Sequence, residues 1–227
     1  MDDGFLIVPN VLDQGRCVKA LALIASLERT HSAVLASKDL FAIRDVCGIL
    51  PELIPVVWTS SLRDLVSRYC GERAFITKSI YFDKPAASNW FVAYHQDISI
   101  SVDRRYEVDG LKGWTSKRGV TGVIPPPAFL ERTLTIRIHF DDTDGSNGAL
   151  RVLPKSHTQG IRKVPTVVSE EVLCSVDRGG AMLMRPLLMH ASSRSTTDKP
   201  RRVLHLEFND LELPEPLRWA ERRVLPA

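Results

Sequence analysis

A histidine and an aspartate stand two positions apart in Phe91–Ser99, FVAYHQDIS, a run that is typical of a β-strand. Because side chains alternate between the two faces of a strand, we expect His95 and Asp97 to share one face. A neutral imidazole and a carboxylate can bind a divalent metal ion together. A half-exposed polar sheet face produces the same spacing. The pair alone therefore leaves metal binding and a solvated surface as alternatives, and a third ligand is needed.

The third ligand must come from the other histidines of the chain. His190 is the preferred candidate because it ends an apolar run, AMLMRPLLMH, and precedes a small polar run, ASSRSTTD. Strand ends that open into loops are where binding groups concentrate. His139 and His205 lie inside predicted strands, where a core histidine is the default, and either remains a rival ligand. His31 and His157 lie in polar loop or turn segments, which favours surface roles.

Two histidines and one carboxylate make the ligand set that non-haem Fe(II) oxygenases use, because three positions on the iron stay open for a chelating co-substrate and dioxygen. Arg201 follows the turn STTDKP after His190. A strand that returned beside the metal ligands would bring its guanidinium alongside them, and this fork of N–H donors binds carboxylates well. An ordinary surface arginine is the alternative, and Arg202 on the opposite face is the internal comparison.

The segments that must position these residues change in character near residue 75. In residues 1–74 a short apolar run, FLIVPNVL, is followed by Asp13, a residue type favoured at helix N-caps, and then by apolar residues at helical spacing. The later segment SSLRDLVSRYC has similar spacing and ends at Gly71, a typical helix stop. We therefore expect residues 1–74 to be mainly helical and to support the rest of a single domain.

Residues 75–210 contain short strand-like runs separated by Gly, Pro, Asn and Asp: FITKSIYF, FVAYHQDISI, RTLTIRIHF, ALRVLP, AMLMRPLLMHA and RVLHLEF. This pattern favours a β-sandwich or barrel over a parallel α/β sheet. Residues 102–130 have no clear period and contain three consecutive prolines. Because a long irregular loop inside a compact domain is often functional, we expect a lid over the His95 and Asp97 face, with a plain surface excursion as the alternative.

The overall composition argues against several classes of function. The 227 residues are 44% hydrophobic and 25% charged with a net charge of +3, and the basic residues are scattered, which argues against nucleic-acid binding. No apolar stretch approaches the roughly 20 residues of a membrane span. The four cysteines are far apart and the N-terminus lacks a signal-peptide pattern, so we expect a cytoplasmic protein.

The chain resembles the phytanoyl-CoA dioxygenase family of Fe(II)- and 2-oxoglutarate-dependent oxygenases. The matching motifs are HQD at His95–Asp97, NGALRVLPKSH at Asn147–His157, HAS at His190–Ser192, and Arg201. Arg201 lies eleven places after the histidine of HAS, as the co-substrate arginine of the family does. The resemblance implies a mainly β fold with N-terminal helices, the double-stranded β-helix, which is a jelly-roll-like or cupin-like barrel.

The same resemblance implies roles for the individual site residues. His95, Asp97 and His190 would bind Fe(II), while Arg201, helped by Ser192, would anchor 2-oxoglutarate, and dioxygen would be the oxidant. In related halogenases a small residue replaces the carboxylate so that chloride can bind the iron. The presence of Asp97 therefore favours hydroxylation, or another oxidation of a C–H bond. The reaction would give succinate and carbon dioxide, and the substrate would be a small molecule such as a metabolite or natural-product intermediate.

Further residues are candidates for contacts with the bound molecules. Arg137 stands where some relatives carry a tryptophan that lines the co-substrate pocket, so we expect it, together with Lys78, to bind an acidic group of the co-substrate or the substrate. Trp114 and Arg118, in the expected lid, and Gln96 are candidates for substrate contacts. For each of them, packing or surface charge is the alternative role.

Two other functions stay open on the sequence alone. One is a metal-dependent, cupin-like enzyme that does not use 2-oxoglutarate and takes His139 as an extra ligand. The other is a barrel that binds a small molecule without catalysis. Indifference to 2-oxoglutarate would select the first, and absence of a bound metal would select the second. The complete set of metal ligands together with Arg201 argues against the non-catalytic barrel.

Overall fold

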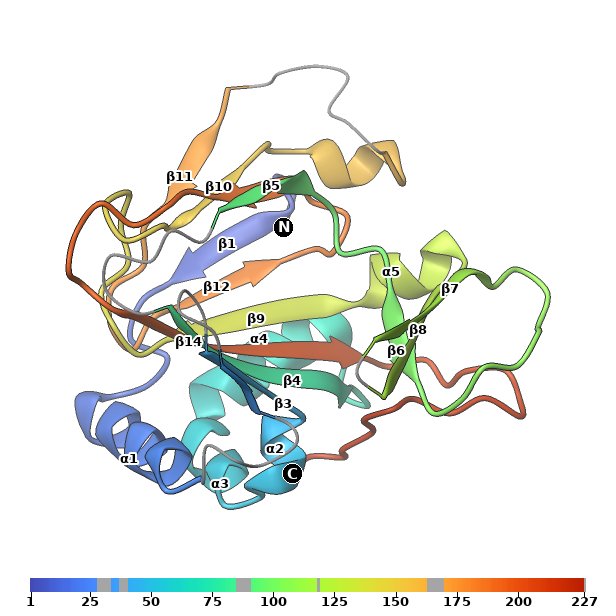
Figure 1. Cartoon of the computed structure of the whole chain (residues 1–227), viewed down its shortest axis with the longest axis horizontal. Coiled ribbons are helices and arrows are strands. Elements are labelled where there is room, and N and C mark those ends of the chain that lie inside the picture. The colour runs from blue at the N-terminus through green and yellow to red at the C-terminus, as the bar shows by residue number, and fades with distance from the viewer. Residues whose placement is uncertain (28–33, 37–40, 85–90, 118, 163–169, 227) are drawn as a thin grey trace.

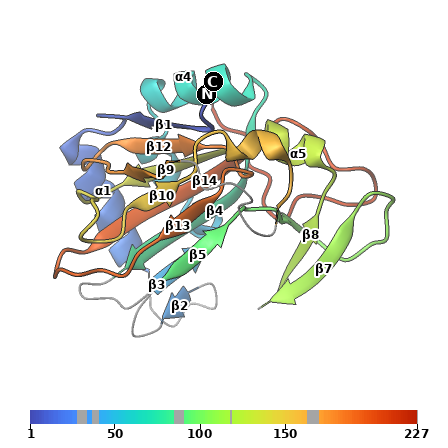
Figure 2. The same cartoon turned by 90° about the horizontal axis from the view of Figure 1, so that it is seen from above.

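The computed structural model describes residues 1–27, 34–36, 41–84, 91–117, 119–162 and 170–226. Two antiparallel sheets make up most of the molecule, and a layer of helices covers one of them (Figures 1 and 2). We call the seven-stranded sheet the major sheet and the four-stranded sheet the minor sheet. A three-stranded sheet, called the small sheet, lies to one side of them.

The three sheets are built from antiparallel pairs. The major sheet has the order β1 (Phe5–Val8), β12 (Ala181–Met184), β9 (Leu134–His139), β14 (Arg201–Asn209), β4 (Phe75–Lys84), β3 (Phe41–Arg44) and β2 (Val34–Ala36). The minor sheet has the order β11 (Val172–Cys174), β10 (Leu150–Val152), β13 (His190–Ser192) and β5 (Val92–His95). The small sheet has the order β6 (Ile100–Val102), β8 (Val120–Ile124) and β7 (Lys112–Lys117).

Most of the helices pack on one face of the major sheet: α1 (Gln14–Ala25), α2 (Val46–Ile49), α3 (Leu53–Val57) and α4 (Ser60–Cys70). Side-chain alternation in the two central strands explains this arrangement. Ile136 and Ile138 of β9, with Leu204, Leu206 and Phe208 of β14, all point to the helices and are buried. The main hydrophobic core therefore lies between the helices and the major sheet.

The opposite face of the major sheet carries a group of polar and charged side chains. Arg137 of β9, Lys78 of β4, and Arg201, His205 and Glu207 of β14 all line a cavity on this side. These residues fall at the alternate positions of the same strands that supply the core. Burying a charged group destabilises the fold unless the group forms an ion pair, a hydrogen bond or a contact with a ligand. The charged side chains of this face therefore need such partners, which apolar side chains would not.

The segment FVAYHQDISI does not form the single strand that its sequence predicts. β5 ends at His95, residues 96–99 lie outside any strand, and β6 begins at Ile100 in a different sheet. Strand alternation therefore does not explain the position of Asp97. Its backbone N–H donates to the carbonyl of Pro186, 2.9 Å away, and this contact fixes the chain where it leaves β5.

The expected strand AMLMRPLLMH is likewise divided between two sheets. β12 ends at Met184 in the major sheet, and His190 begins β13 in the minor sheet rather than ending a strand. β14 then returns to the major sheet, between β9 and β4, and does not pair with β13 as expected. Arg201 consequently approaches the histidine from the facing sheet.

Residues 102–130 are not an irregular loop, which corrects the sequence prediction. They contain β7, β8 and the beginning of α5 (Pro127–Arg132), and β6 joins β8 to complete the small sheet. The glycines of this segment hid its strands from sequence analysis, because Gly is depleted in strands. The N-terminal part is also less helical than expected, because β1 and the β2–β3 pair form the two edges of the major sheet.

No helix in the described part of the chain is both long enough and apolar enough to cross a membrane.

The C-terminal segment packs on the helical side of the major sheet through a cluster of polar side chains. The hydroxyl of Ser79 in β4 donates to Glu221, 2.8 Å away, and accepts the backbone N–H of Cys47 at 3.1 Å. Arg223 pairs with Asp45 at 2.6 Å. Burial raises the pKa of Glu221 to about 8, so the folded chain keeps this carboxyl protonated at neutral pH.

The helix-facing core predicts a large effect of truncation at its centre. Ile138→Ala should lower the free energy of unfolding by about 2–5 kcal/mol, because it removes buried contacts and leaves a cavity. Val18→Ala, at a side chain on α1 that is 58% exposed, is the control and should change stability by less than about 0.5 kcal/mol. Urea unfolding of both variants measures the difference, and equal effects would contradict the assignment of the core.

The Glu221 cluster predicts a pH dependence of stability. The native carboxyl holds its proton up to about pH 8, whereas the unfolded chain releases it near the ordinary value of 4.5. The native state therefore binds more protons in this window, and the contribution of Glu221 to stability falls as the pH rises through it. Urea unfolding at pH 5 to 8 should show a smaller decline for Glu221→Gln than for the parent protein; parallel curves would contradict the raised pKa.

Candidate functional site

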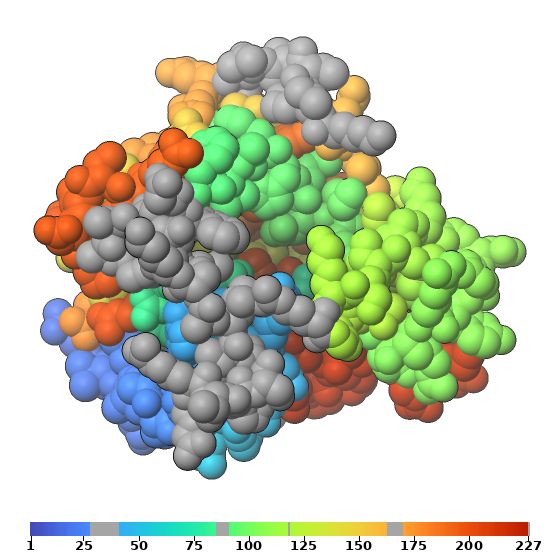
Figure 3. Space-filling view, viewed as in Figure 1, coloured from blue at the N-terminus to red at the C-terminus, as the bar shows by residue number. Residues whose placement is uncertain are grey.

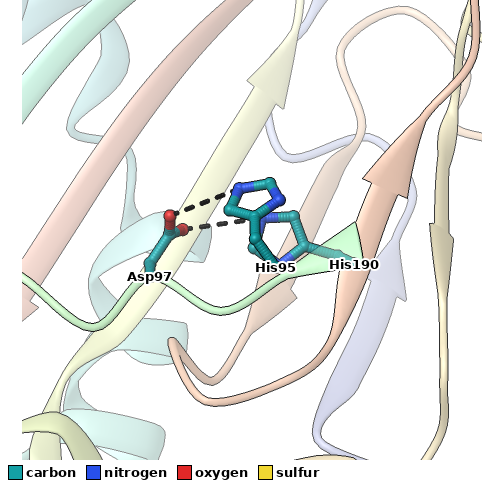
Figure 4. A group of neighbouring side chains, drawn as sticks. All are labelled: His95, Asp97 and His190. Carbon is teal, nitrogen blue, oxygen red and sulfur yellow. Dashed lines mark ion pairs between the residues drawn. The ribbon is translucent and has the colours of Figure 1, made fainter. Parts of the chain in front are cut away.

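His95 and His190 lie opposite each other on adjacent strands of the minor sheet. They are a register pair between β5 and β13, and their ring centroids lie 4.2 Å apart. Directly opposite residues of an antiparallel pair point to the same side of the sheet, so this pairing brings the two imidazoles together. Asp97, two residues past the end of β5, turns its carboxylate toward both rings (Figure 4).

The three side chains form a compact group of possible metal ligands. Nε2 of His95 lies 3.8 Å from Oδ1 of Asp97, and Nε2 of His190 lies 3.7 Å from Oδ2. One ligand atom from each residue falls within 4.8 Å of the others. Ligand atoms about 2.1 Å from a shared metal ion lie roughly 3 Å apart at right angles, so small side-chain movements suffice to bring all three onto one ion.

The hydrogen bonds of both imidazoles suit metal binding. Nδ1 of His95 lies 2.9 Å from the carbonyl of Ala93, and Nδ1 of His190 lies 2.9 Å from the carbonyl of Leu188. Each Nδ1 therefore carries the hydrogen and donates it to a carbonyl, which leaves the lone pair on Nε2, the atom that faces Asp97. This tautomer and a backbone carbonyl as partner are typical of metal-binding histidines.

The charges of these three side chains also suit metal binding. Burial lowers the pKa of His190, so its ring is neutral at physiological pH. Burial raises the pKa of Asp97, but the neighbouring His190, His205 and Lys78 lower it by more, and the carboxylate stays ionised. Two imidazoles that offer Nε2 and one carboxylate are the donor set that suits Fe(II) with open positions. The residues present thus fit such an ion.

The group lies in a cavity of about 270 Å³ between the major and minor sheets. In the space-filling view a hollow opens below β5, between the two sheets (Figure 3). Apolar side chains of both sheets line part of it: Ile80, Phe82, Val92 and Leu150. A second cleft, of about 740 Å³, lies beside Asp97 and is bordered by the small sheet. Arg44, Lys78 and Asp97 line both spaces.

Arg201 is buried in the wall of the cavity. Its Nη1 donates to the carbonyl of Gly148 and to the hydroxyl of Ser192, the latter at 3.3 Å. Burial, with a contribution from Arg137, lowers the pKa of Arg201 to about 9, so the guanidinium is charged at neutral pH. Among the described residues no carboxylate pairs with Arg201. Arg202, on the opposite face as expected, pairs with Asp141 at 2.6 Å.

Gly148 allows the backbone of Ser193 and the side chain of Lys84 to approach closely. Its φ is +85°, a backbone conformation that favours glycine. A Cβ at this position would lie 2.7 Å from the carbonyl oxygen of Ser193 and 2.8 Å from Nζ of Lys84. Lys84, opposite Arg201 in the β4–β14 pair, donates to that same oxygen at 2.7 Å. Burial, followed by the charge of Arg201, lowers the pKa of Lys84 to about 8.

Lys78 and Arg137 belong to a chain of polar contacts along the cavity floor. Nζ of Lys78 lies 2.8 Å from Oε1 of Glu207, and the same oxygen lies 3.2 Å from Nε2 of His205. Nδ1 of His205 in turn lies 3.1 Å from Nη1 of Arg137. Lys78 is therefore engaged by a carboxylate of the protein itself. His205 lies on the cavity floor beside the three possible metal ligands, and its two ring nitrogens contact Glu207 and Arg137.

The remaining predicted contacts have different surroundings. Gln96 donates to the carbonyls of Gly160 and Leu187 and accepts the backbone N–H of Arg162, so its amide ties three segments together. Trp114 of β7 packs on an apolar cluster centred on Val123 and Leu130 and does not line the cavity. Arg118 and His31 lie outside the described residues.

The rival metal ligand His139 is buried away from the group. Its Nδ1 lies 2.8 Å from the hydroxyl of Thr143, and burial holds the pKa of its imidazole well below the ordinary value. It belongs neither to the ligand group nor to the cavity lining. His157, in the short helical turn Ser156–Gln159, is equally separate.

Sequence reasoning missed three residues of the site: Glu207, Lys84 and Arg44. Glu207 could have been found, because it shares the face of Arg201 and His205 by simple alternation in RRVLHLEF. Lys84 could not, because its approach to Arg201 depends on the register of β4 with β14. Arg44 reaches the cavity only because β3 adds to the major sheet beyond β4.

Comparisons with known proteins agree with this architecture. The family model described as phytanoyl-CoA dioxygenase (PhyH) matches residues 1–203. No curated protein sequence matches the chain. Among solved structures, EctD from S. alaskensis in its apoform superposes with a TM-score of 0.71 at 18% identity, over 95% of this chain and 76% of that one. These matches confirm the double-stranded β-helix, with its mainly β core and N-terminal helices.

Two further solved structures share the fold at low identity. One is HygX from Streptomyces hygroscopicus with nickel and 2-oxoglutarate bound, with a TM-score of 0.64 at 14% identity, over 92% of this chain and 83% of that one. The other is the carbocyclase SnoK from nogalamycin biosynthesis, described as non-haem and α-ketoglutarate dependent. It has a TM-score of 0.69 at 16% identity, over 93% of this chain and 81% of that one. Because the family model spans nearly the whole sequence, the chain belongs to the phytanoyl-CoA dioxygenase family of Fe(II)- and 2-oxoglutarate-dependent oxygenases.

Proposed function

We propose that this protein oxidises a C–H bond of a small molecule, using Fe(II), 2-oxoglutarate and dioxygen. One observation carries the proposal: His95, Asp97 and His190 form a ligand group in the same cavity as the buried guanidinium of Arg201. Three metal ligands alone would be compatible with many classes of metalloenzyme. A charged arginine with no acidic partner in the described part of the chain adds a site for the carboxylate of a co-substrate.

The roles of the side chains follow from their contacts. Nε2 of His95, Nε2 of His190 and the carboxylate of Asp97 would hold Fe(II) from one side, and the cavity gives access to the other. When bound, the iron would supply the oxidative chemistry that consumes dioxygen and 2-oxoglutarate and gives succinate and carbon dioxide. The protein's part is to bind, orient and exclude water, as in other cofactor-dependent enzymes.

Arg201 and Ser192 would bind the distal carboxylate of 2-oxoglutarate. The hydroxyl of Ser192 and the carbonyl of Gly148 hold the guanidinium in place, so little ordering is needed when a ligand arrives. A charged hydrogen bond formed in a buried site contributes more than one at the surface. HygX, a structural neighbour, has 2-oxoglutarate bound together with a metal, which supports this assignment.

Hydroxylation is favoured over halogenation because Asp97 provides a carboxylate ligand. A halogenase needs that position free for a halide, whereas here the carboxylate faces both histidines. The proposal also includes a cytoplasmic location, which the four unpaired, buried cysteines support. Small-molecule oxidation without nucleic-acid binding agrees with the scattered basic residues.

The metal assignment predicts the behaviour of Asp97→Ala. Because the variant loses the charged ligand of the group, it should not retain iron at one equivalent per chain and should not form succinate from 2-oxoglutarate. Metal analysis after anaerobic loading and gel filtration measures the first, and a succinate assay the second. Asp64→Ala, at an exposed position on α4, is the matched control and should behave like the parent protein. Full iron retention by Asp97→Ala would contradict the assignment.

The co-substrate assignment predicts the behaviour of Arg201→Gln. Loss of a charged hydrogen bond of about 1.5–3 kcal/mol should raise the KM for 2-oxoglutarate about ten- to hundredfold, while iron binding persists. Slow, substrate-independent formation of succinate provides the measurement. Arg63→Gln, exposed on α4, is the control, whereas Arg202 is unsuitable because of its ion pair with Asp141. An unchanged KM for Arg201→Gln would place the co-substrate elsewhere.

A further inference from the structure

Arg137 is a cation that the proposed binding of iron and 2-oxoglutarate leaves without a partner. It lies in the cavity lining, and its Nε has no hydrogen-bond partner among the residues that the structure describes. Within the described part of the chain, its Nη1 hydrogen-bonds to an uncharged acceptor, Nδ1 of His205. No carboxylate of the described residues lies within ion-pair distance of its guanidinium. Burial lowers the pKa of Arg137 to about 10, so the group still carries its charge at neutral pH.

A count of charges shows the imbalance. The cavity lining contains four cations, Arg44, Lys78, Arg137 and Arg201, and two anions, Asp97 and Glu207. Fe(II) and the dianion 2-oxoglutarate would cancel each other, so the excess of two positive charges persists in the loaded site. Lys78 is matched by Glu207, and Arg201 by the co-substrate, which leaves the surplus on the interior Arg137 and on the exposed Arg44.

The guanidinium of Arg137 is held in a fixed position. Glu207 accepts from Nε2 of His205, which leaves Nδ1 of that ring as the acceptor for Arg137. The ring of Phe82 lies 5.9 Å from the guanidinium carbon on another side. An arginine oriented in this way is ready to bind a planar carboxylate or a phosphate through two N–H donors.

The position of Arg137 distinguishes it from the co-substrate arginine. Arg201 is tied to Gly148 and Ser192, on the side of the minor sheet. Arg137 is tied through His205 and Glu207 to Lys78, which also lines the second cleft beside Asp97. That cleft is bordered by the small sheet and gives a second molecule its own approach to the metal group.

We propose that Arg137 binds an anionic group, a carboxylate or a phosphate, of the organic substrate, so that the enzyme selects acidic small molecules. This inference rests on the proposed function, because it assumes that iron and 2-oxoglutarate occupy the cavity. The apolar side chains Phe82, Val92 and Leu150 in the same lining suit a substrate whose acidic group is attached to an apolar body.

The test uses protein loaded anaerobically with Fe(II) and 2-oxoglutarate. Phenylacetate and phenyl phosphate serve as acidic probes and phenylacetamide as the neutral counterpart, all at equal ionic strength. The anaerobic complex of the protein with Fe(II) and 2-oxoglutarate should show a weak visible absorption band, and changes in this band on adding a probe give its Kd. Thermal stabilisation is the second readout. At least one acid should bind ten times more tightly than the amide. The tighter of the two acids identifies the carboxylate or the phosphate as the preferred group.

Arg137→Gln should abolish this preference while leaving the Kd for 2-oxoglutarate within about twofold of the parent value. The amide of glutamine can still donate to His205, so the variant removes the charge and keeps the neighbouring contact. Arg137→Lys should restore part of the preference. Arg63→Gln on α4 should leave every value unchanged.

Three results would overturn the inference. The first is a parent protein that does not distinguish the acids from the amide, and the second is a preference that survives in Arg137→Gln. The third is a tenfold or greater loss of 2-oxoglutarate affinity in Arg137→Gln, which would make Arg137 a co-substrate ligand while the proposed function stands. Failure of the parent protein to form the visible band at all would instead reject the proposed function, and this inference with it.

Discussion

The pairing of β5 with β13 positions the possible metal ligands of this molecule. It places His95 directly opposite His190, and the carbonyls of Ala93 and Leu188 then set the tautomer of each ring. A slip of one residue in this short pairing would send one imidazole to the other face of the sheet. Asp97, the third possible ligand, depends on the same pairing, because it lies two residues past the end of β5 and its backbone N–H is held by the carbonyl of Pro186.

The major sheet meets two opposite requirements with one pattern of alternation. In β14, Leu204, Leu206 and Phe208 bury their side chains against the helices, while His205 and Glu207 face the cavity. The apolar face provides stability that the polar face does not. Polar contacts reduce the free-energy cost of burying this face. They run in series from Lys78 to Glu207, His205 and Arg137, so that each of these side chains contacts another polar group.

The motifs of the sequence predicted the fold class and the grouping of His95, Asp97 and His190 as possible metal ligands, because residue types and their spacing are local properties. They did not predict how the ligands meet. His190 and Arg201 were expected on adjacent strands of one sheet, but β13 and β14 belong to facing sheets. Long-range register, which places Lys84 opposite Arg201, has no local signal. The glycine-containing strands β7 and β8 were not predicted for a similar reason. Their pairing with each other, rather than their amino-acid composition, stabilises them as strands.

Lys84, Arg201 and Arg137 are cationic side chains that lie close enough in the protein interior to influence one another. Like charges held together in a buried place oppose folding, and each lowers the tendency of the next to stay protonated. An anion bound among them removes that repulsion, so the ligand-filled protein is the more stable form. Molecules without ligand would unfold more often and meet proteases sooner.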